Sequence, residues 1–308
     1  MPSDNRNFAP EAGCPLCGGR GRRILDARDR NRETTGETFS YARCGSCGTV
    51  YIVDPPADLG RYYQGGYYDF DADGEPFWKS SRQRIRAAAY RIELLRQHVS
   101  AGHLIEIGAG TGAFACAARD AGFDVSVIEM SEQCCRYLSE REGIRTICSD
   151  RAVEALAELP TASAVALWHV LEHLPNPAEV LAAIAGRLEP GGILAVGVPN
   201  PRSLQFRMMK GRWAHLDAPR HLSLIPAEAL EAKGRELGLR VVESTTNDPE
   251  GLEFNQLGWA SALRSRPSDG PTSPLVGNAA LAICAALAPL ERTGHRGTAS
   301  TLLLRKEA

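Results

Sequence analysis

Short apolar runs alternate with helical patterns along most of the chain. The apolar runs predict strands at residues 103–107, 124–130, 144–148, 162–170, 193–200, 239–246 and 299–306. Helical patterns lie between them, and Ser131 and Asn176 stand where N-cap residues are expected. Strands that alternate with helices usually form a parallel sheet covered on both faces, so we expect an α/β fold with seven strands.

Two further helical patterns flank this alternation. Residues 80–99 carry apolar side chains at helical spacing with arginines between them, and predict a helix that leads into the main domain. The connection at 247–297 is far longer than an ordinary loop and suggests a functional insertion. Its apolar stretch 274–290 is too short to span a bilayer. Packing on its own domain or in a homodimer, an apolar acceptor pocket, and contact with a membrane surface all remain open.

The composition argues against a protein that binds nucleic acid. The chain has 44% hydrophobic and 23% charged residues and a formal net charge of −2, so no nucleic-acid partner is expected. The first residues, MPSDNRNFAPEAG, contain no apolar segment of the kind found in secretory signals. We therefore expect a cytoplasmic protein.

Two cysteine pairs near the N-terminus have the spacing of a zinc site. Cys14 and Cys17 form the first pair and Cys44 and Cys47 the second, each followed by a glycine that allows a tight turn. Four thiolates at this spacing suit tetrahedral zinc and leave no open position for substrate. We predict a structural zinc ribbon at residues 1–56.

A linker rich in Gly, Pro, Asp and Tyr follows at residues 57–80. Its tyrosines either cover an acceptor or simply pack against the protein; they are Tyr62, Tyr63, Tyr67 and Tyr68.

A glycine-rich turn after the first strand of the main domain indicates a nucleotide-like ligand. The stretch GAGTGA at 108–113 is weak evidence alone, since it nearly fits the dinucleotide fingerprint. Glu106 lies just before the turn, where a carboxylate would oppose a pyrophosphate but could orient an ammonium group. Glu129 ends the second strand and can accept hydrogen bonds from both hydroxyls of a ribose. Ser149 and Asp150 follow the third strand and offer an acceptor for an adenine amino group.

In its motifs the chain resembles the class I S-adenosylmethionine-dependent methyltransferases. EIGAGTG, VIEM, SD, HVLEHLPNP and LEPGGILAVGVPN match that family's motifs in order, over about residues 80–246. The resemblance implies a Rossmann-like seven-stranded fold, mostly parallel with the last strand antiparallel, at residues 81–308, with insertions at about 201–225 and 247–297. It also implies S-adenosylmethionine as cofactor, held by Glu106, Gly108, Gly110, Gly112, Glu129, Met130, Asp150, Arg151, Trp168 and His169.

A narrower resemblance is to bacterial small-molecule methyltransferases with an N-terminal zinc-binding domain, which act on deoxysugars, polysaccharides or lipids. The cysteine pairs, the tyrosine-rich linker and WAHLDAPRHLSLI at 213–225 carry this likeness. The sugar enzymes have a further large C-terminal domain that these 308 residues do not match, which weakens the case for a nucleotide-sugar acceptor. The implied activity is C- or O-methylation of a small molecule.

An uncharged acceptor needs a base near neutral pH, for which histidine is well suited. His173, just beyond the fourth strand, and His221, in the 213–225 segment, are our preferred bases, with Glu172 and Asp217 as further candidates. Glu172 and His173 could instead brace their loop. Two other functions remain to be weighed: a zinc-bearing ribosomal-RNA methyltransferase, disfavoured by the acidic net charge, and a zinc scaffold with a degenerate domain, disfavoured by the complete motif set.

Overall fold

The computed structural model describes residues 13–63, 68, 70–263 and 274–307. Within them the larger sheet has seven strands in the order β10-β11-β8-β7-β4-β5-β6. They are β4 (His103–Ile107), β5 (Asp124–Glu129), β6 (Arg145–Cys148), β7 (Ala162–Trp168), β8 (Leu188–Pro199), β10 (Leu239–Thr245) and β11 (Ala299–Lys306). Only β11 runs antiparallel to its neighbours. This is the class I methyltransferase sheet, as predicted.

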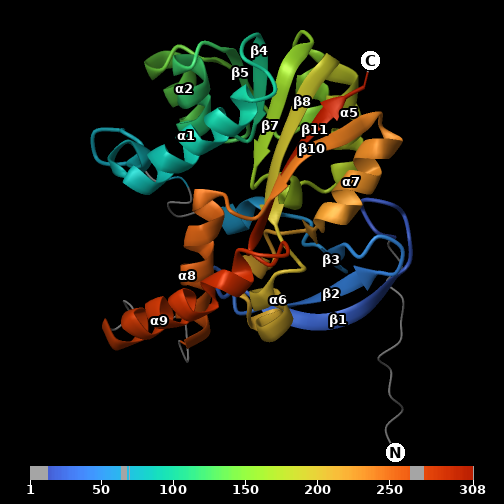
Figure 1. The fold of residues 1–308 in the computed structure, drawn as a ribbon, viewed down its shortest axis with the longest axis vertical. Coiled ribbons are helices and arrows are strands. Elements are labelled where there is room, and N and C mark those ends of the chain that lie inside the picture. Colours follow the sequence, from blue (N-terminus) through green and yellow to red (C-terminus); the bar gives the residue numbers. More distant parts are fainter. Residues whose placement is uncertain (1–12, 64–67, 69, 264–273, 308) are drawn as a thin grey trace, which may run out of the picture.

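Helices cover both faces of this sheet, whose central strands, such as β7, are buried on both sides (Figure 1). One face packs against α1 (Arg82–Arg96) and α2 (Ala113–Asp120), and the other against α4 (Ala152–Ala157), α5 (Pro177–Arg187) and α7 (Ala227–Glu236). A short helix α3 (Glu132–Arg136) begins at the Ser131 cap. Asn176 precedes α5, but its side chain donates to Glu179 rather than capping the helix.

The direction in which the chain adds strands to the sheet reverses at β4. The chain continues from β4 to β5 and β6 on one side of it, and then returns to add β7 and β8 on the other side. In open α/β sheets, ligands bind at the carboxyl ends of the strands that flank such a reversal. The turn after β4 and the residues after β7 therefore mark where a ligand should bind.

A second, four-stranded sheet has the order β1-β2-β3-β9 in the described residues. Its first three strands come from the N-terminal region: β1 (Gly21–Arg28), β2 (Thr38–Cys44) and β3 (Val50–Ile52). The fourth, β9 (Ser223–Leu224), belongs to the segment after β8 and pairs with β3 through Val50 and Tyr51. The two sheets are therefore joined by a strand as well as by the chain that links them.

The predicted insertions are helical. Helix α6 (Leu204–Met209) follows β8, and α8 (Pro249–Leu263) and α9 (Pro274–Glu291) lie between β10 and β11. Ala280 of α9 is buried, whereas Leu275 is 82% exposed. In the described part of the chain, no helix is long and apolar enough to cross a membrane.

Candidate functional site

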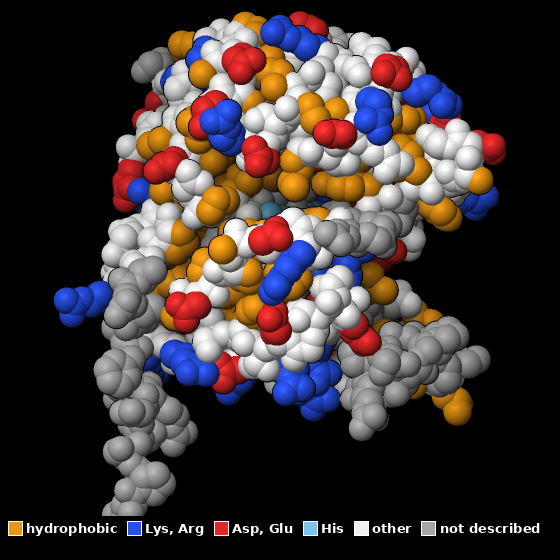
Figure 2. All heavy atoms as spheres, turned by 180° about the vertical axis from the view of Figure 1, so that it is seen from behind, with side chains coloured by type: hydrophobic (Ala, Val, Ile, Leu, Met, Phe, Trp, Pro, Cys, Tyr) orange, Lys and Arg blue, Asp and Glu red, His pale blue; other side chains and the backbone are white. Residues whose placement is uncertain are grey.

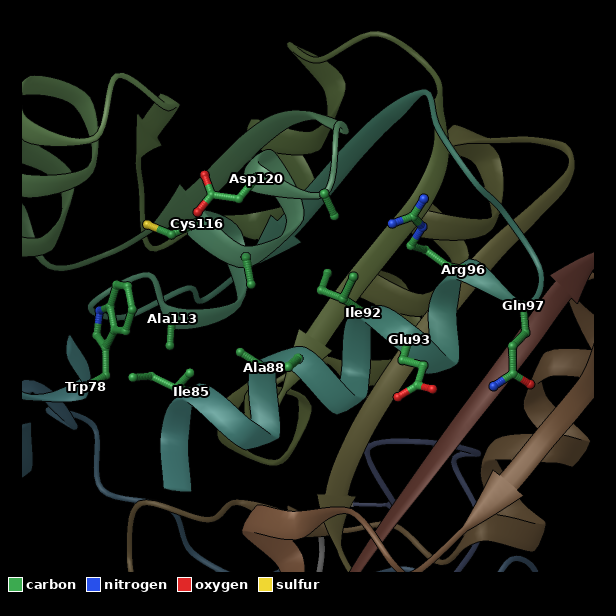
Figure 3. Close-up of a pocket in the computed structure, with 13 residues that line it drawn as sticks. Trp78, Ile85, Ala88, Ile92, Glu93, Arg96, Gln97, Ala113, Cys116 and Asp120 are labelled. Atoms are coloured by element: carbon green, nitrogen blue, oxygen red, sulfur yellow. The ribbon is translucent and has the colours of Figure 1, made fainter. Parts of the chain in front are cut away.

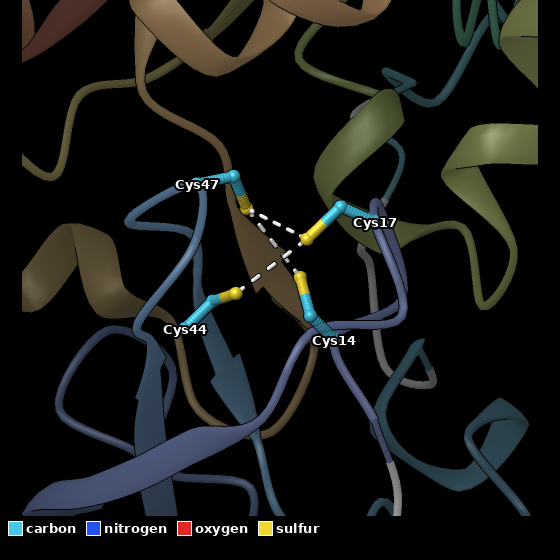
Figure 4. Close-up of side chains that lie close together, drawn as sticks. All are labelled: Cys14, Cys17, Cys44 and Cys47. Carbon is cyan, nitrogen blue, oxygen red and sulfur yellow. Dashed lines mark hydrogen bonds between the residues drawn. The ribbon is translucent and has the colours of Figure 1, made fainter.

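The four N-terminal cysteines converge in the structure (Figure 4). Their sulfur atoms are separated by 3.6 Å between Cys14 and Cys47, 3.5 Å between Cys17 and Cys44, and 3.4 Å between Cys17 and Cys47. Tetrahedral thiolates bound to zinc at about 2.3 Å would lie about 3.8 Å apart, so the cluster is close to the size that zinc requires. All nine cysteines are free thiols, so no disulfide competes for these four.

The turns that hold this cluster have the same geometry in both pairs. Gly18 and Gly48 have φ angles of +71° and +79°, in the left-handed region that only glycine adopts readily. The Gly18 amide donates to the Cys14 carbonyl and the Gly48 amide to the Cys44 carbonyl. The glycine after each cysteine pair is thus explained by the turn that it allows.

A cavity of about 730 Å³ opens at the carboxyl ends of β4, β5 and β7. Figure 2 shows hydrophobic side chains along a hollow across the middle of the molecule, with a histidine visible inside it. The glycine turn forms one wall. A Cβ atom on Gly108 would lie 2.5 Å from a methyl group of Val170, whereas one on Gly110 would meet nothing closer than 3.7 Å. The turn therefore packs tightly against Val170 at Gly108 and leaves space for a ligand at Gly110.

Glu106 lies buried at the base of this wall, and its Oε2 atom has no hydrogen-bond partner. Burial raises the pKa of this carboxyl to about 8, even though Arg91 acts to lower it. A ligand ammonium group would supply both the missing partner and the missing charge. This is the chemistry expected at the methionine end of S-adenosylmethionine, so the residue fits that cofactor.

Glu129 lies at the end of β5 on the opposite side of the turn. Its carboxylate accepts hydrogen bonds from the amides of Gly110, Met130 and Ser131 at 2.8 to 2.9 Å, and from the Tyr68 hydroxyl at 3.2 Å. The backbone therefore aims this carboxylate into the cavity, where ribose hydroxyls can reach it by displacing the Tyr68 hydroxyl.

Most, but not all, of the other predicted cofactor residues line the cavity. Met130, Asp150, Trp168 and His169 line the cavity together with Gly108 and Gly110. Gly112 does not line it: a Cβ atom there would lie 2.4 Å from the Leu138 side chain, so this glycine lets the turn pack against the protein. The side chain of Arg151 is 73% exposed and lies 3.7 Å from Glu154. Of the linker tyrosines, Tyr63 and Tyr68 line the cavity, Tyr62 is buried away from it, and Tyr67 lies outside the described residues.

Sequence reasoning missed a group of charged residues that close the cavity from α1 and α8. Arg91 is buried, its guanidinium lies 4.4 Å from the centre of the Trp168 ring, and it forms ion pairs with Asp248 at 2.8 Å and Glu250 at 2.7 Å. Arg84 also lines the cavity. The sequence shows several arginines in the helical pattern at 80–99, but it does not show which of them is buried, because the acidic partners of Arg91 lie more than 150 residues away.

On the acceptor side, the chain following β7 forms a short 3₁₀ turn, Leu171–His173. It places Glu172 beside three imidazoles: His169 Nδ1 is 3.6 Å and His221 Nε2 is 4.0 Å from Glu172 Oε1, and the His173 and His221 rings are 4.6 Å apart. Burial and the neighbouring His173 lower the pKa of His221 to about 4, so its ring is neutral at pH 7. Three of the four predicted catalytic side chains thus meet in one cluster, but of the four only His173 lines the cavity.

Asp217, the fourth, lies at the edge of this cluster, 3.8 Å from His221 Nε2. Its main partner is Arg220, which is fully buried and also binds Asp29 of the N-terminal region. Although burial acts in the opposite direction, Arg220 holds the pKa of Asp217 well below its usual range. These contacts tie the 213–225 segment to the N-terminal region that carries the cysteine cluster.

A second hollow, of about 720 Å³, lies between α1 and α2 (Figure 3). Ile85, Ala88 and Ile92 of α1 face Ala113 and Cys116 of α2 across it. Its charged lining residues are Glu93, Arg96 and Asp120. None of the predicted cofactor or catalytic residues lines this hollow.

Comparisons with known proteins identify the part of the chain that forms the cofactor cavity as a methyltransferase domain. The family described as a methyltransferase domain matches residues 79–244, more than half of the chain. A ubiquinone biosynthesis O-methyltransferase of Nitrosococcus oceani is 29% identical over 181 residues, which cover 54% of this chain and 74% of that protein. A protein of the same description from Xylella fastidiosa is 28% identical over 47% of this chain and 59% of that one.

Among solved structures, a putative sarcosine dimethylglycine methyltransferase from Galdieria sulphuraria matches with a TM-score of 0.49 and 16% identity, covering 78% of this chain and 92% of that one. That likeness is too distant to bear on the substrate. The family match, in contrast, spans the strands and turns that build the cofactor cavity. The chain therefore belongs to the methyltransferase-domain family and is a class I S-adenosylmethionine-dependent methyltransferase.

Proposed function

We propose that the protein methylates a hydroxyl group of a small molecule bound beside the Glu172–His173–His221 cluster. The observation that carries this is that three imidazoles meet one buried carboxylate just after β7, where His169 and His173 of the group line the cofactor cavity. The O-methyltransferase descriptions of the relatives support oxygen as the methylated atom. Methylation at carbon is the second candidate, since an acidic C–H needs the same removal of a proton.

S-adenosylmethionine supplies a methyl group on a positively charged sulfur, so the protein needs mainly to align the acceptor and remove its proton. The glycine turn, Glu106 and Glu129 hold the cofactor. The Glu172–His173–His221 cluster activates the acceptor. We assign Asp217 to positioning His221, because its carboxylate is already paired with Arg220.

We further propose that the cysteine cluster binds a structural zinc ion. Four protein thiolates leave no ligand position open, so zinc there supplies stability and no chemistry. It would hold the turns from which β2 and β3 extend, and through β9 the segment that carries His221.

Replacement of His173 or His221 by alanine tests the acceptor assignment. General acid–base groups contribute about 100-fold to 10,000-fold to turnover, so we expect losses of that order with nearly unchanged affinity for S-adenosylhomocysteine. The assay uses labelled S-adenosylmethionine with phenolic, catecholic and sugar hydroxyl acceptors, and calorimetry measures cofactor affinity. His295→Ala, which changes an exposed histidine outside the cavity lining, is the matched control. Full turnover in both test variants would show that neither histidine activates the acceptor.

A further inference from the structure

One buried carboxylate of the acceptor cluster has no hydrogen-bond partner. The Glu172 side chain is inaccessible to solvent, and neither Oε1 nor Oε2 accepts a hydrogen bond. The ring nitrogens of His169 and His221 approach only to 3.6 and 4.0 Å. A buried carboxylate is costly unless a cation neutralises it. This carboxylate therefore needs a positive charge beside it, which a protonated His169 or a bound cation can supply.

The two histidines beside this carboxylate are held in the orientation that metal ligands adopt. His221 Nδ1 lies 3.0 Å from the carbonyl oxygen of His215, and His173 Nδ1 lies 3.1 Å from that of Arg220 and 2.9 Å from the Tyr63 hydroxyl. A carbonyl oxygen can only accept, so each Nδ1 carries the hydrogen and each Nε2 keeps its lone pair in the neutral ring. Histidines that bind metals usually donate their other N–H to a carbonyl or carboxylate in this way.

The donor atoms are close enough for one ion. One atom each from Glu172, His173 and His221 lie within 4.8 Å of one another. His221 Nε2 and Glu172 Oε1, 4.0 Å apart, are within the roughly 4.4 Å that two ligands can span when each is about 2.2 Å from a metal. Two imidazoles and one carboxylate form a ligand set for zinc, manganese or iron. We propose that Glu172, His173 and His221 bind a divalent transition-metal cation, separate from the thiolate site.

This inference rests on the proposed function and specifies how the acceptor cluster acts. His173 lines the cavity, so a cation held by it would have open positions facing the acceptor. An acceptor hydroxyl that binds there has its pKa lowered and releases its proton to solvent. Its oxygen then forms the bond to the methyl carbon as the bond from that carbon to sulfur breaks. The preferred acceptor is thus a hydroxyl that can bind a metal, such as one of a catechol.

Manganese is the probe, because it prefers nitrogen and oxygen ligands whereas the thiolates favour zinc. The full chain is treated with a mild chelator, retention of one zinc per chain is checked by elemental analysis, and Mn²⁺ binding is followed by electron paramagnetic resonance. We expect one Mn²⁺ per chain. Affinity should fall at least tenfold in Glu172→Gln and His221→Ala and stay unchanged in Glu189→Gln, an exposed carboxylate on β8. S-adenosylhomocysteine binding by each variant verifies that it is folded, and His173→Gln replaces any variant that is not.

Absence of saturable Mn²⁺ binding, or binding that survives Glu172→Gln, would overturn the metal site. A second measurement compares methyl transfer with and without the cation, and we expect at least tenfold stimulation. If methyl transfer proceeds equally well without it, the inference fails while the proposed function stands, and His169 rather than a metal neutralises Glu172. If the cation binds but no hydroxyl acceptor is methylated, the proposed function fails while the metal site stands.

Discussion

At the scale of single residues, the cofactor cavity depends on two carboxylates in contrasting environments. Glu106 has one carboxyl oxygen with no partner, whereas Glu129 accepts hydrogen bonds from three backbone amides. The first therefore lacks a partner that a ligand can supply, and the second is held in place by the loop around it. Substitution of the two residues should have different effects.

Glu106 makes cofactor affinity dependent on pH. Its pKa of about 8 means that the carboxyl is protonated in the free protein near pH 7, whereas pairing with an ammonium group requires the carboxylate. Binding then releases a proton, so affinity for S-adenosylhomocysteine should rise by up to about tenfold per pH unit from pH 6 and level off near pH 8. Calorimetry in buffers of different ionisation enthalpy measures the released proton. Glu106→Gln should abolish it, and equal proton release from that variant would refute the assignment.

Glu129 should matter for affinity itself. Glu129→Ala removes the acceptor for the ribose hydroxyls and for three loop amides, so S-adenosylhomocysteine should bind about 10- to 100-fold more weakly. Glu132→Ala, three residues further on and exposed, should bind as the wild type does. Isothermal titration calorimetry compares the two, and equal affinities would contradict the ribose role.

At the scale of secondary-structure elements, the sheet was predictable and the way in which the sheets join was not. The strands at 103–107 and 299–306 have the predicted bounds, because uninterrupted apolar runs between turn residues have few other ways to fold. The strand predicted at 193–200 instead begins at Leu188, before the glycine pair. A two-residue strand such as Ser223–Leu224 has no periodicity to detect, since only its partner β3 defines it.

In the candidate site, too, the residues in local motifs could be predicted from the sequence, and those that depend on distant contacts could not. The cofactor residues belong to short motifs whose spacing is local, and the sequence identified Glu106, Glu129 and the glycines that line the cavity. Arg91, with its partners Asp248 and Glu250, depends on a contact between α1 and α8 that local pattern cannot reveal. Arg220 was likewise missed, because its partner Asp29 lies in another sheet.

The contact between Asp29 and Arg220 should transmit damage in the ribbon to the acceptor site. Asp29→Asn leaves the buried Arg220 without one of its two carboxylates, and loss of a partner from a buried ion pair costs about 3–5 kcal/mol. We expect a lower melting temperature and lower turnover with unchanged S-adenosylhomocysteine affinity. Asp26→Asn, at an exposed position on β1 three residues before Asp29, should behave like the wild type. The idea fails if the two variants have the same stability and turnover.

At the scale of the whole molecule, two sheets with different sources of stability share one site. The seven-stranded sheet has apolar layers on both faces, whereas the four-stranded sheet is smaller and packs around one apolar cluster, which includes Phe39, Tyr41 and Trp213. Small sheets of this kind usually need a metal ion or a partner to remain folded. The acceptor cluster lies where the two sheets meet.

Replacement of Cys14, one of the four proposed zinc ligands, tests this dependence. Cys14→Ser should contain one zinc fewer per chain than the wild type and melt at a lower temperature, because metal binding contributes directly to the folding of such modules. Methyl transfer should fall with it, since β9 follows His221 and pairs with the ribbon. Cys284→Ser, which changes a cysteine of α9 outside the cluster, serves as the control. Unchanged zinc content in Cys14→Ser would exclude the cysteine cluster as the zinc site.

The pairing of β3 with β9 also affects the order in which the protein can be made. The ribosome produces the cysteine turns and the first three strands early, but Val50 must wait for Leu224 before its sheet is complete. Until then β3 is an open edge with apolar side chains, the kind of edge through which nascent chains associate with one another. Zinc bound early by the proposed cysteine site would keep the three strands folded while this edge waits for β9, so the yield of native protein should depend on the zinc supplied during synthesis.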